Sequence, residues 1–564
     1  MVDVLAGKEK VSRRSYMKYG GAGIVVVAGA AAGAYYYSQP KPTATTTAET
    51  TVEATSAAKK SLVVGMTLTS VLSMDPAKAL DETMKSIDSM CYDRLLRMDG
   101  PDYKITPGLA ESYDLSEDKL TYTFHLRKGV KFHTGNELKA DAVKFTIDRM
   151  RIMHPEYTAS WMFGDAPIKE VKVVDDYTAQ IVLETPFVPI LSLLGNAACA
   201  GIIDPAVMEH DVAGDGGSMW LDDHSFGAGP FMLKEWVRDV RLVIVQNPNY
   251  WGVKPWLEEV KILSVPETVD QRMMLSRGDL DLAEELTFED IKELRKDPNI
   301  NVVEFPSQEG FFLYILLKAF GKDVGSPFLN PKVGWALLYA TDFQGIIDTL
   351  CPGYMRWAGI PQGVLGALSE EEVRELMPYD PEKAKQLLRE AGYKEGDGPA
   401  WTHIYWPGVM YGVRNEDLTL KLVSDWSAVG FKPTMQLVPP NVFEERFFAG
   451  DWITVTREGG MLDYNDPDNA ASFWFHTGVG ASKRQTYDVT KLDPLTEAGR
   501  VEPDPDKRDA IYKELARTFY TDPENPPCFV GMFQAKMSIG MRKNVKGYFL
   551  DAYNFDDYRN VTIS

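Results

Sequence analysis

Short segments of alternating apolar and polar residues recur along this chain and constrain its fold more than any other feature. Every second residue is apolar over 120–126 and 177–183, and a third apolar run over 242–246 ends at the turn dipeptide Asn247-Pro248. This alternation is typical of strands that bury one face. The sequence therefore predicts sheet structure with a buried side.

Segments with helical spacing accompany these strands. Apolar residues recur three and four positions apart within 143–150, which predicts an amphipathic helix. Asp380 and Pro381 are typical of a helix start, and Gly392 of the residue just past its end. A third helix is predicted from about residue 417 to 429. Strands and helices mixed in this way indicate an α/β protein.

Length and charge narrow the function. The chain has 564 residues, enough for two or three domains at about 100–200 residues each. Its formal net charge is −21, and a body this acidic repels phosphate backbones, so nucleic acid is excluded as a partner.

The four cysteines lie far apart in the sequence, which excludes a CxxC metal or redox motif. Their spacing leaves open three disulfide pairings or isolated thiols. No metal site and no cofactor are predicted. The four are Cys91, Cys199, Cys351 and Cys528.

Residues 1–37 are predicted to be a signal peptide or membrane anchor. A basic stretch, 12–18, precedes an uncharged run from Tyr19 to Ala34 that is rich in Gly, Ala and Val. The pair Arg13-Arg14 resembles a twin-arginine signal, and a general secretory signal is the alternative. The run would just span a bilayer if it continued through residue 37.

Residues 38–60 are rich in Thr, Pro and Ala and hold almost nothing apolar to bury. Such a composition predicts a disordered stalk between the signal or anchor and the globular body. The order of these segments indicates a protein that is exported to the outer face of the cell membrane.

Five segments within about residues 61–550 carry sequences that resemble one known family, in that family's order. They are 105–132 (ITPGLAESYDLSEDKLTYTFHLRKGVKF), 227–252 (GAGPF through NPNYWG), 277–281 (RGDLD), 379–393 (YDPEKAKQLLREAGY) and 463–469 (DYNDPDN). The family is the family 5 extracellular solute-binding proteins, which serve as the dipeptide- and oligopeptide-binding components of ABC importers. The helix that begins at Asn330-Pro331 departs from the family pattern, because both of its usual arginines are missing.

This resemblance implies a two-lobed, hinged α/β fold of the type II periplasmic-binding kind. Lobe I would comprise 61–308 and 532–564, with an extra subdomain at about 107–228, and lobe II would comprise 309–531. Apolar runs near 311–316 and 528–533 would be the paired hinge strands. The implied function is capture of a peptide between the lobes and its delivery to a membrane permease with ATPase subunits. The chain itself would be a monomer and not an enzyme.

The resemblance also implies candidate ligand-binding residues. Asp463 matches an aspartate that pairs with a peptide's α-ammonium group, and such a charge-assisted bond is worth about 1.5–3 kcal/mol. Arg457 matches an arginine that meets the ligand's carboxylate, and Arg414 could serve in its place. Tyr464 and Asn465 belong, with Asp463, to the matching segment 463–469, which we call the cleft segment. Gly460 stands where the family usually has Trp, which reshapes the pocket.

Aromatic side chains support an alternative ligand. Trp406 and Trp474 fall near the cleft segments, and sugar-binding members of the family stack sugars on such rings. The alternative is therefore the same transport role with an oligosaccharide as ligand. A secreted hydrolase such as a glycosidase is a third, less favoured class, because the resemblance covers almost the whole body and leaves no room for a catalytic domain.

Overall fold

The computed structural model describes residues 60–68, 71–78, 82–98, 104–152, 158–196, 200–284, 286–356, 360–361, 364–460, 464–477, 488–550 and 555–564. The predicted signal or anchor and all of the predicted stalk except Lys60 lie outside these residues, as do Cys199 and Asp463. Residues 59–564 belong to one compact unit, and the description below concerns that unit alone.

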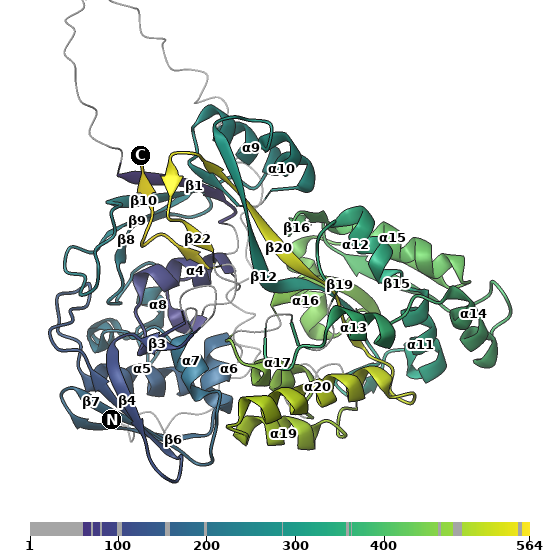
Figure 1. Ribbon diagram of the computed structural model, residues 1–564, viewed down its shortest axis with the longest axis horizontal. Coiled ribbons are helices and arrows are strands. Elements are labelled where there is room, and N and C mark those ends of the chain that lie inside the picture. Colours follow the sequence, from purple (N-terminus) through teal and green to yellow (C-terminus); the bar gives the residue numbers. More distant parts are fainter. Residues whose placement is uncertain are drawn as a thin grey trace, which may run out of the picture. The chain divides into compact units, whose positions relative to one another are not determined.

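A ten-stranded mixed sheet forms the centre of this unit (Figure 1). Its strands come from almost the whole length of the sequence, so several neighbours in the sheet are distant along the chain, whereas β8, β9 and β10 are consecutive. In spatial order they are β18 (Lys432–Leu437), β15 (Ala400–Tyr405), β19 (Thr454–Gly460), β12 (Ile300–Ile315), β20 (Phe529–Arg542), β11 (Leu282–Ala283), β1 (Ser61–Met66), β10 (Glu259–Ser264), β9 (Arg241–Gln246) and β8 (Phe231–Val237).

The two longest strands, β12 and β20, pair antiparallel and join two halves of this sheet. Residues 300–306 of β12 pair with 536–542 of β20, on the side of the sheet that continues into β11 and β1. Residues 310–314 pair with 529–534 and also with β19 on the other side. The register shifts between Pro306 and Gly310, which is a bulge where the two halves meet. The predicted strands at 311–316 and 528–533 are confirmed as parts of β12 and β20.

We call the elements between β12 and β20 lobe II, and those before β12 and after β20 lobe I. Each lobe has its own buried apolar cluster, and lobe I has a further cluster under a small four-stranded sheet. That small sheet has the order β4 (Ala110–Leu115), β5 (Thr121–Leu126), β7 (Thr178–Leu183), β6 (Ile168–Asp175). With α5 (Ala140–Ile152), α6 (Thr158–Asp165) and α7 (Ile190–Gly195), it forms what we call the subdomain.

The predicted strands and helix of the subdomain are confirmed. In β5 and β7 every second side chain is buried, among them Phe124 and Ile181, and α5 buries Val143 and Ile147. A fully buried ion pair fixes α5 to the chain that precedes it. Arg149 donates from Nη1 and Nη2 to both oxygens of Asp75, over 2.9 and 2.6 Å.

Lobe I contains further short elements around its share of the large sheet. They are η1 (Pro76–Lys78), α4 (Glu82–Cys91), β2 (Leu96–Arg97), β3 (Thr106–Pro107), η2 (Pro205–His210), α8 (Ser218–Leu221), α9 (Thr268–Arg277), α10 (Phe288–Leu294), β21 (Val545–Lys546), β22 (Phe549–Leu550), β23 (Asp556–Asp557) and β24 (Thr562–Ile563).

Apart from β15, β18 and β19, lobe II consists mainly of helices. They are α11 (Pro331–Ala340), α12 (Phe343–Leu350), α13 (Glu370–Leu376), α14 (Pro381–Glu390), α15 (Asn415–Ala428), α16 (Pro440–Ala449), α17 (Pro467–Trp474), α19 (Asp493–Val501) and α20 (Pro505–Thr521). Shorter elements are η3 (Pro327–Leu329) and the hairpins β13 (Lys318–Ala319) with β14 (Lys322–Asp323), and β16 (Val409–Met410) with β17 (Val413–Arg414).

The two helices predicted from the sequence in this part of the chain are confirmed as α14 and α15. The Asp380 carboxylate accepts a hydrogen bond from the Lys383 backbone N–H and caps α14, and Gly392 has a positive φ just past its end. Helix α15 begins at Asn415, two residues before the predicted start, because the β16–β17 hairpin leads directly into it.

Candidate ligand-binding site

Arg457 lies in β19, opposite Phe312 of β12. Its guanidinium faces α16, where Nε lies 3.3 Å from Glu444 Oε1 and Nη2 lies 3.2 Å from both Glu444 oxygens. The Phe447 ring of the same helix lies 5.0 Å from the guanidinium carbon, at the distance of a cation–π contact. The arginine predicted to meet a ligand carboxylate is therefore held by a carboxylate of the chain itself.

The cleft segment leads from β19 into α17. Tyr464 is buried, and although it belongs to lobe II it packs with the apolar cluster of the subdomain. Burial, followed by the nearby charges of Asp468 and Asp466, raises the pKa of the Tyr464 phenol well above its usual value. Asn465 is half-buried. The cleft segment thus lies where lobe II contacts the subdomain.

Two buried carboxylates anchor the end of this segment. Asp466 caps α17 by accepting a hydrogen bond from the Asp468 backbone N–H, and it pairs with Arg508 of α20 over 2.5 and 2.6 Å. Asp468 accepts hydrogen bonds from Arg500 of α19 and from Ser472, each over 2.9 Å. Burial raises the pKa of Asp468, although the positive charge of Arg500 acts in the opposite direction. Asp466 and Pro467 thus form the start of α17.

Arg500 also connects lobe II to the subdomain directly. Its carbonyl oxygen accepts a hydrogen bond from the Val188 backbone N–H over 2.9 Å, and its guanidinium carbon lies 5.8 Å from the centre of the Phe187 ring. Both subdomain residues immediately precede α7. Helices α17 and α19 therefore hold the cleft segment against the subdomain.

Trp406 and Arg414 flank the β16–β17 hairpin. Trp406 follows β15, is half-buried and packs against lobe II, while Arg414 is exposed and directly precedes α15. The hairpin itself packs on β12, since the Tyr411 ring meets Phe311 edge-on at 6.1 Å. The Tyr411 carbonyl also accepts a hydrogen bond from the Tyr354 hydroxyl.

Gly408 determines where the Trp406 ring can lie, because a Cβ atom at position 408 would be 1.9 Å from Trp406 Cζ3. The Gly408→Ala substitution is expected to push the ring outward and to shift its fluorescence emission to the red, since the indole gains solvent contact. The same substitution in a Trp406→Phe background serves as the control and is expected to leave the emission spectrum unchanged. An equal shift in both backgrounds would contradict this placement of the ring.

Trp474 lies in the core of lobe II. Its ring stacks on Phe529 of β20 at 4.0 Å with an interplanar angle of 5°, and it is 6% exposed. Trp401 is also buried, and its Nε1–H donates to Thr454 Oγ1. Both tryptophans thus have packing partners within lobe II.

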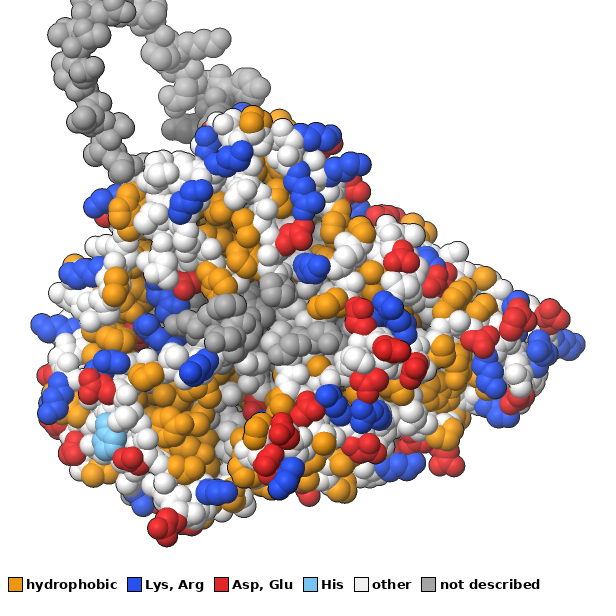
Figure 2. Space-filling model, in the orientation of Figure 1, with side chains coloured by type: hydrophobic (Ala, Val, Ile, Leu, Met, Phe, Trp, Pro, Cys, Tyr) orange, Lys and Arg blue, Asp and Glu red, His pale blue; other side chains and the backbone are white. Residues whose placement is uncertain are grey.

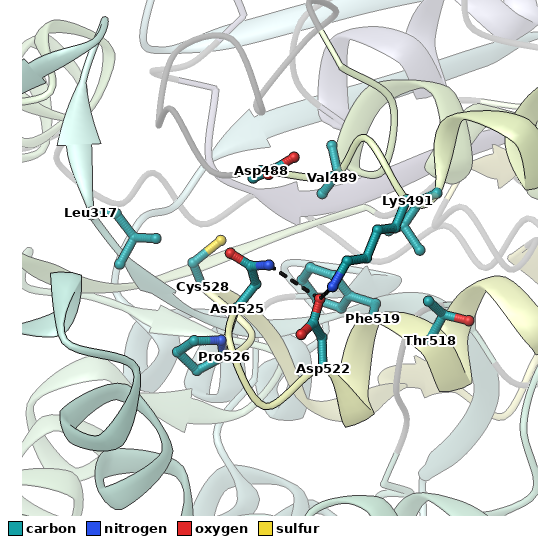
Figure 3. A pocket seen from close by; sticks show the side chains of 11 residues that line it. Leu317, Asp488, Val489, Lys491, Thr518, Phe519, Asp522, Asn525, Pro526 and Cys528 are labelled. Atoms are coloured by element: carbon teal, nitrogen blue, oxygen red, sulfur yellow. Dashed lines mark hydrogen bonds and ion pairs between the residues drawn. The ribbon is translucent and has the colours of Figure 1, made fainter.

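A small pocket opens beside β20 in lobe II (Figure 3). Lys491 and Asn525 both donate to Asp522 Oδ2 there, over 2.7 and 3.1 Å. Its volume of about 20 Å³ is room for about one water molecule. A peptide or a sugar does not fit in this pocket.

Sequence reasoning missed Glu444 and Arg500. Glu444 is 13 residues from Arg457 in the sequence, and only the packing of α16 on β19 brings the two together. Arg500 is an ordinary helix-end arginine in the sequence, and no pattern there indicates a contact with the subdomain.

Other features of the described residues bear on the function. None of their helices is both long and apolar enough to cross a bilayer. Cys91, Cys351 and Cys528 are buried free thiols, and burial raises their pKa values. Within the same residues, no three His, Cys, Asp or Glu side chains gather in a way that could hold a metal ion. Figure 2 shows acidic and basic side chains interspersed over the visible face.

A shared sheet between two lobes, with a small extra sheet on lobe I, is the architecture of type II periplasmic-binding proteins. The crystal structure of a dipeptide-binding protein from Pseudoalteromonas sp. SM9913 in complex with Met-Leu superposes with a TM-score of 0.79 at 21% identity, covering 89% of this chain and 100% of that one. This likeness confirms the predicted fold class.

Sequence comparison gives the family. The glutathione-binding protein GsiB of Salmonella choleraesuis is 32% identical over 514 residues, which cover 89% of this chain and 94% of that protein. The probable D,D-dipeptide-binding periplasmic protein DdpA of Escherichia coli is 26% identical over 511 residues, 87% of this chain and 91% of that protein. Residues 104–482 match the bacterial extracellular solute-binding proteins, family 5, and the chain belongs to this family.

Proposed function

We propose that this chain captures peptides outside the cytoplasm and delivers them to the permease of an ABC importer. The observation that carries the proposal is the position of the cleft segment, which belongs to lobe II but packs against the subdomain of lobe I. A ligand bound beside this segment contacts both lobes and favours their closed arrangement. The dipeptide- and glutathione-binding relatives support a peptide as the ligand.

The proposed roles of the site residues follow the chemistry of a peptide's two ends. Asp463 pairs with the α-ammonium group, and Arg457 meets the carboxylate, with Arg414 as a second cation at the hairpin. Tyr464 and Asn465 form the adjoining wall on the subdomain side. The two proposed aromatic members are Trp406, which flanks the hairpin, and Trp474, which would support the site from the core of lobe II, where it stacks on Phe529.

The lobes are proposed to divide at residues 308/309 and 531/532, close to the bulge between β12 and β20. Gly310 lies at this bulge and pairs with both Gly459 and Gln534. A small change in the twist of these two strands would rotate one lobe relative to the other.

Residues 1–37 are proposed to direct export by a twin-arginine or general secretory route and to anchor the chain if they are retained.

The chain is proposed to act as a monomer that binds its solute without transforming it. The energy for transport would come from the ATPase subunits of the importer, which the permease couples to release of the ligand. The family supports the proposal that this chain binds the solute and leaves the energy of transport to other subunits, since its members are solute-binding proteins.

The Asp463→Asn substitution tests this function. It is expected to weaken the binding of di- and tripeptides by about 10- to 100-fold, because a charge-assisted bond worth about 1.5–3 kcal/mol is lost. Titration calorimetry measures the dissociation constants, and N-acetylated peptides are expected to bind the native protein as weakly as free peptides bind the variant.

Asp451→Asn is the matched control, since Asp451 is an exposed carboxylate of lobe II whose side chain pairs with Arg446. It is expected to leave peptide affinity unchanged. If oligosaccharides bind and peptides do not, the transport role stands and the peptide assignment is wrong.

A further inference from the structure

We propose that Glu444 selects among ligands by competing with their carboxylate group for Arg457. This inference rests on the proposed function, because it assumes that Arg457 faces the peptide's carboxyl end. It adds a residue that no sequence motif points to, and it concerns which peptides the site accepts.

Glu444 binds Arg457 with the same geometry that the carboxylate of a ligand would adopt on this guanidinium. Nη2 of Arg457 lies 3.2 Å from each Glu444 oxygen, and Nε lies 3.3 Å from one of them. A planar guanidinium binds a carboxylate in this two-oxygen manner, so one edge of Arg457 serves one carboxylate at a time. A ligand that approaches this edge has to displace Glu444.

Arg457 itself is held in place. Its backbone pairs with Phe312 in the middle of the large sheet, and the Phe447 ring lies 5.0 Å from its guanidinium carbon. Glu444 is freer to move, because it reaches β19 from the surface of α16 and its side chain is 41% exposed, compared with 28% for Arg457. The glutamate can therefore turn into solvent while the arginine keeps its position.

Two costs follow for a ligand whose free carboxylate takes this edge of Arg457. The ion pair between Glu444 and Arg457 has to open, and the displaced glutamate remains close enough to repel the incoming negative charge. A ligand whose carboxyl end is an amide carries no such charge and leaves the pair closed. Glu444 thus narrows the difference in affinity between free-acid and amidated peptides.

The Glu444→Gln substitution isolates this effect, because the amide oxygen still accepts a hydrogen bond from Arg457 while the negative charge is gone. We expect the dissociation constant of Met-Leu to fall about tenfold, and that of Met-Leu amide to stay within about twofold, as measured by titration calorimetry on the full chain. The increase in affinity for Met-Leu that the substitution produces should be smaller in 1 M salt, where the Debye length falls to about 3 Å.

Glu445→Gln is the matched control, since Glu445 is the adjacent residue of α16 and is exposed. It is expected to change neither affinity. If Glu444→Gln alters the two ligands equally or alters neither, the competition does not exist, although peptide binding stands. If the native protein binds neither Met-Leu nor any other di- or tripeptide in calorimetry, the proposed function fails and this inference fails with it.

Discussion

Replacing Arg149 with Met is expected to lower the free energy of unfolding by about 3–5 kcal/mol, because the substitution leaves a buried carboxylate without its partner. Arg149 binds both oxygens of Asp75, and the two side chains are only 4% and 0% exposed. Ser218 and the Ala77 backbone N–H complete the hydrogen bonds of Asp75. Urea unfolding measures the loss.

Lys144→Met is the control on the same helix. Lys144 pairs with Asp148 on the surface of α5, with side chains that are 43% and 31% exposed, and such a pair contributes less than about 1 kcal/mol. The double variant Asp75→Leu/Arg149→Met is expected to recover much of the stability, since no charge is then buried. Equal losses for Arg149→Met and Lys144→Met would contradict the role given to the buried pair.

The same pair predicts a pH dependence. Burial acts to raise the pKa of Asp75, but the charge and hydrogen bonds of Arg149 outweigh it and lower the pKa below its usual value. A lowered folded-state pKa gives stability that is present above the unfolded-state value and is lost as the pH falls through the folded-state value. In Arg149→Met burial, the largest influence on Asp75, is opposed only by the hydrogen bonds from Ser218 and the Ala77 backbone N–H, so the pKa of Asp75 is expected to rise and protonation in acid to stabilise the variant. The stability difference between the two proteins is therefore expected to narrow as the pH falls, first through the raised folded-state pKa of the variant, above about 4, and then through the lowered folded-state pKa of the native protein, below it.

The second large effect is expected at Gly310. A Cβ atom there would lie 2.2 Å from the Phe533 carbonyl oxygen of β20, so alanine would force two paired strands apart in the middle of the sheet. We expect Gly310→Ala to lower the free energy of unfolding by about 3 kcal/mol, the upper range for an overpacked interior. Differential scanning calorimetry would show the loss as a lower transition temperature.

Gly164→Ala is the control for this substitution. Gly164 is an exposed residue of α6 with open space around its Cα, so alanine is expected to stabilise the helix by up to about 1 kcal/mol. A Gly310→Ala variant as stable as the native protein would mean that β20 yields easily at the bulge.

The parts of the fold that depend on local sequence were predictable. The alternation over 120–126 predicts β5 because a pleated strand turns every second side chain to the core, and Asp380 predicts the start of α14 because its carboxylate meets a backbone N–H three residues away. The order of the large sheet was not predictable from these patterns. Nothing in the residues of β20 indicates that this strand inserts between β12 and β11.

In the candidate site, too, the local sequence was predictable and the contacts between distant elements were not. The resemblance to a family placed Tyr464 and Asn465 in the segment 463–469, with Arg457 a few residues before it. It did not indicate that Glu444 forms an ion pair with Arg457. Nor did it indicate that Tyr464 packs with an apolar cluster whose other members precede it by more than 200 residues in the sequence. Both contacts arise from the packing of distant elements, and a motif describes only the residues within it.

The central position of β20 also affects how the protein is made. This strand pairs with β12 and β11, yet all the elements of lobe II are synthesised between β12 and β20. During translation the ribosome therefore exposes the edge of β12 long before its partner exists, and the sheet closes only after lobe II has emerged. An exporter that threads unfolded chains could use this delay, whereas one that carries folded proteins would have to wait until β20 is in place.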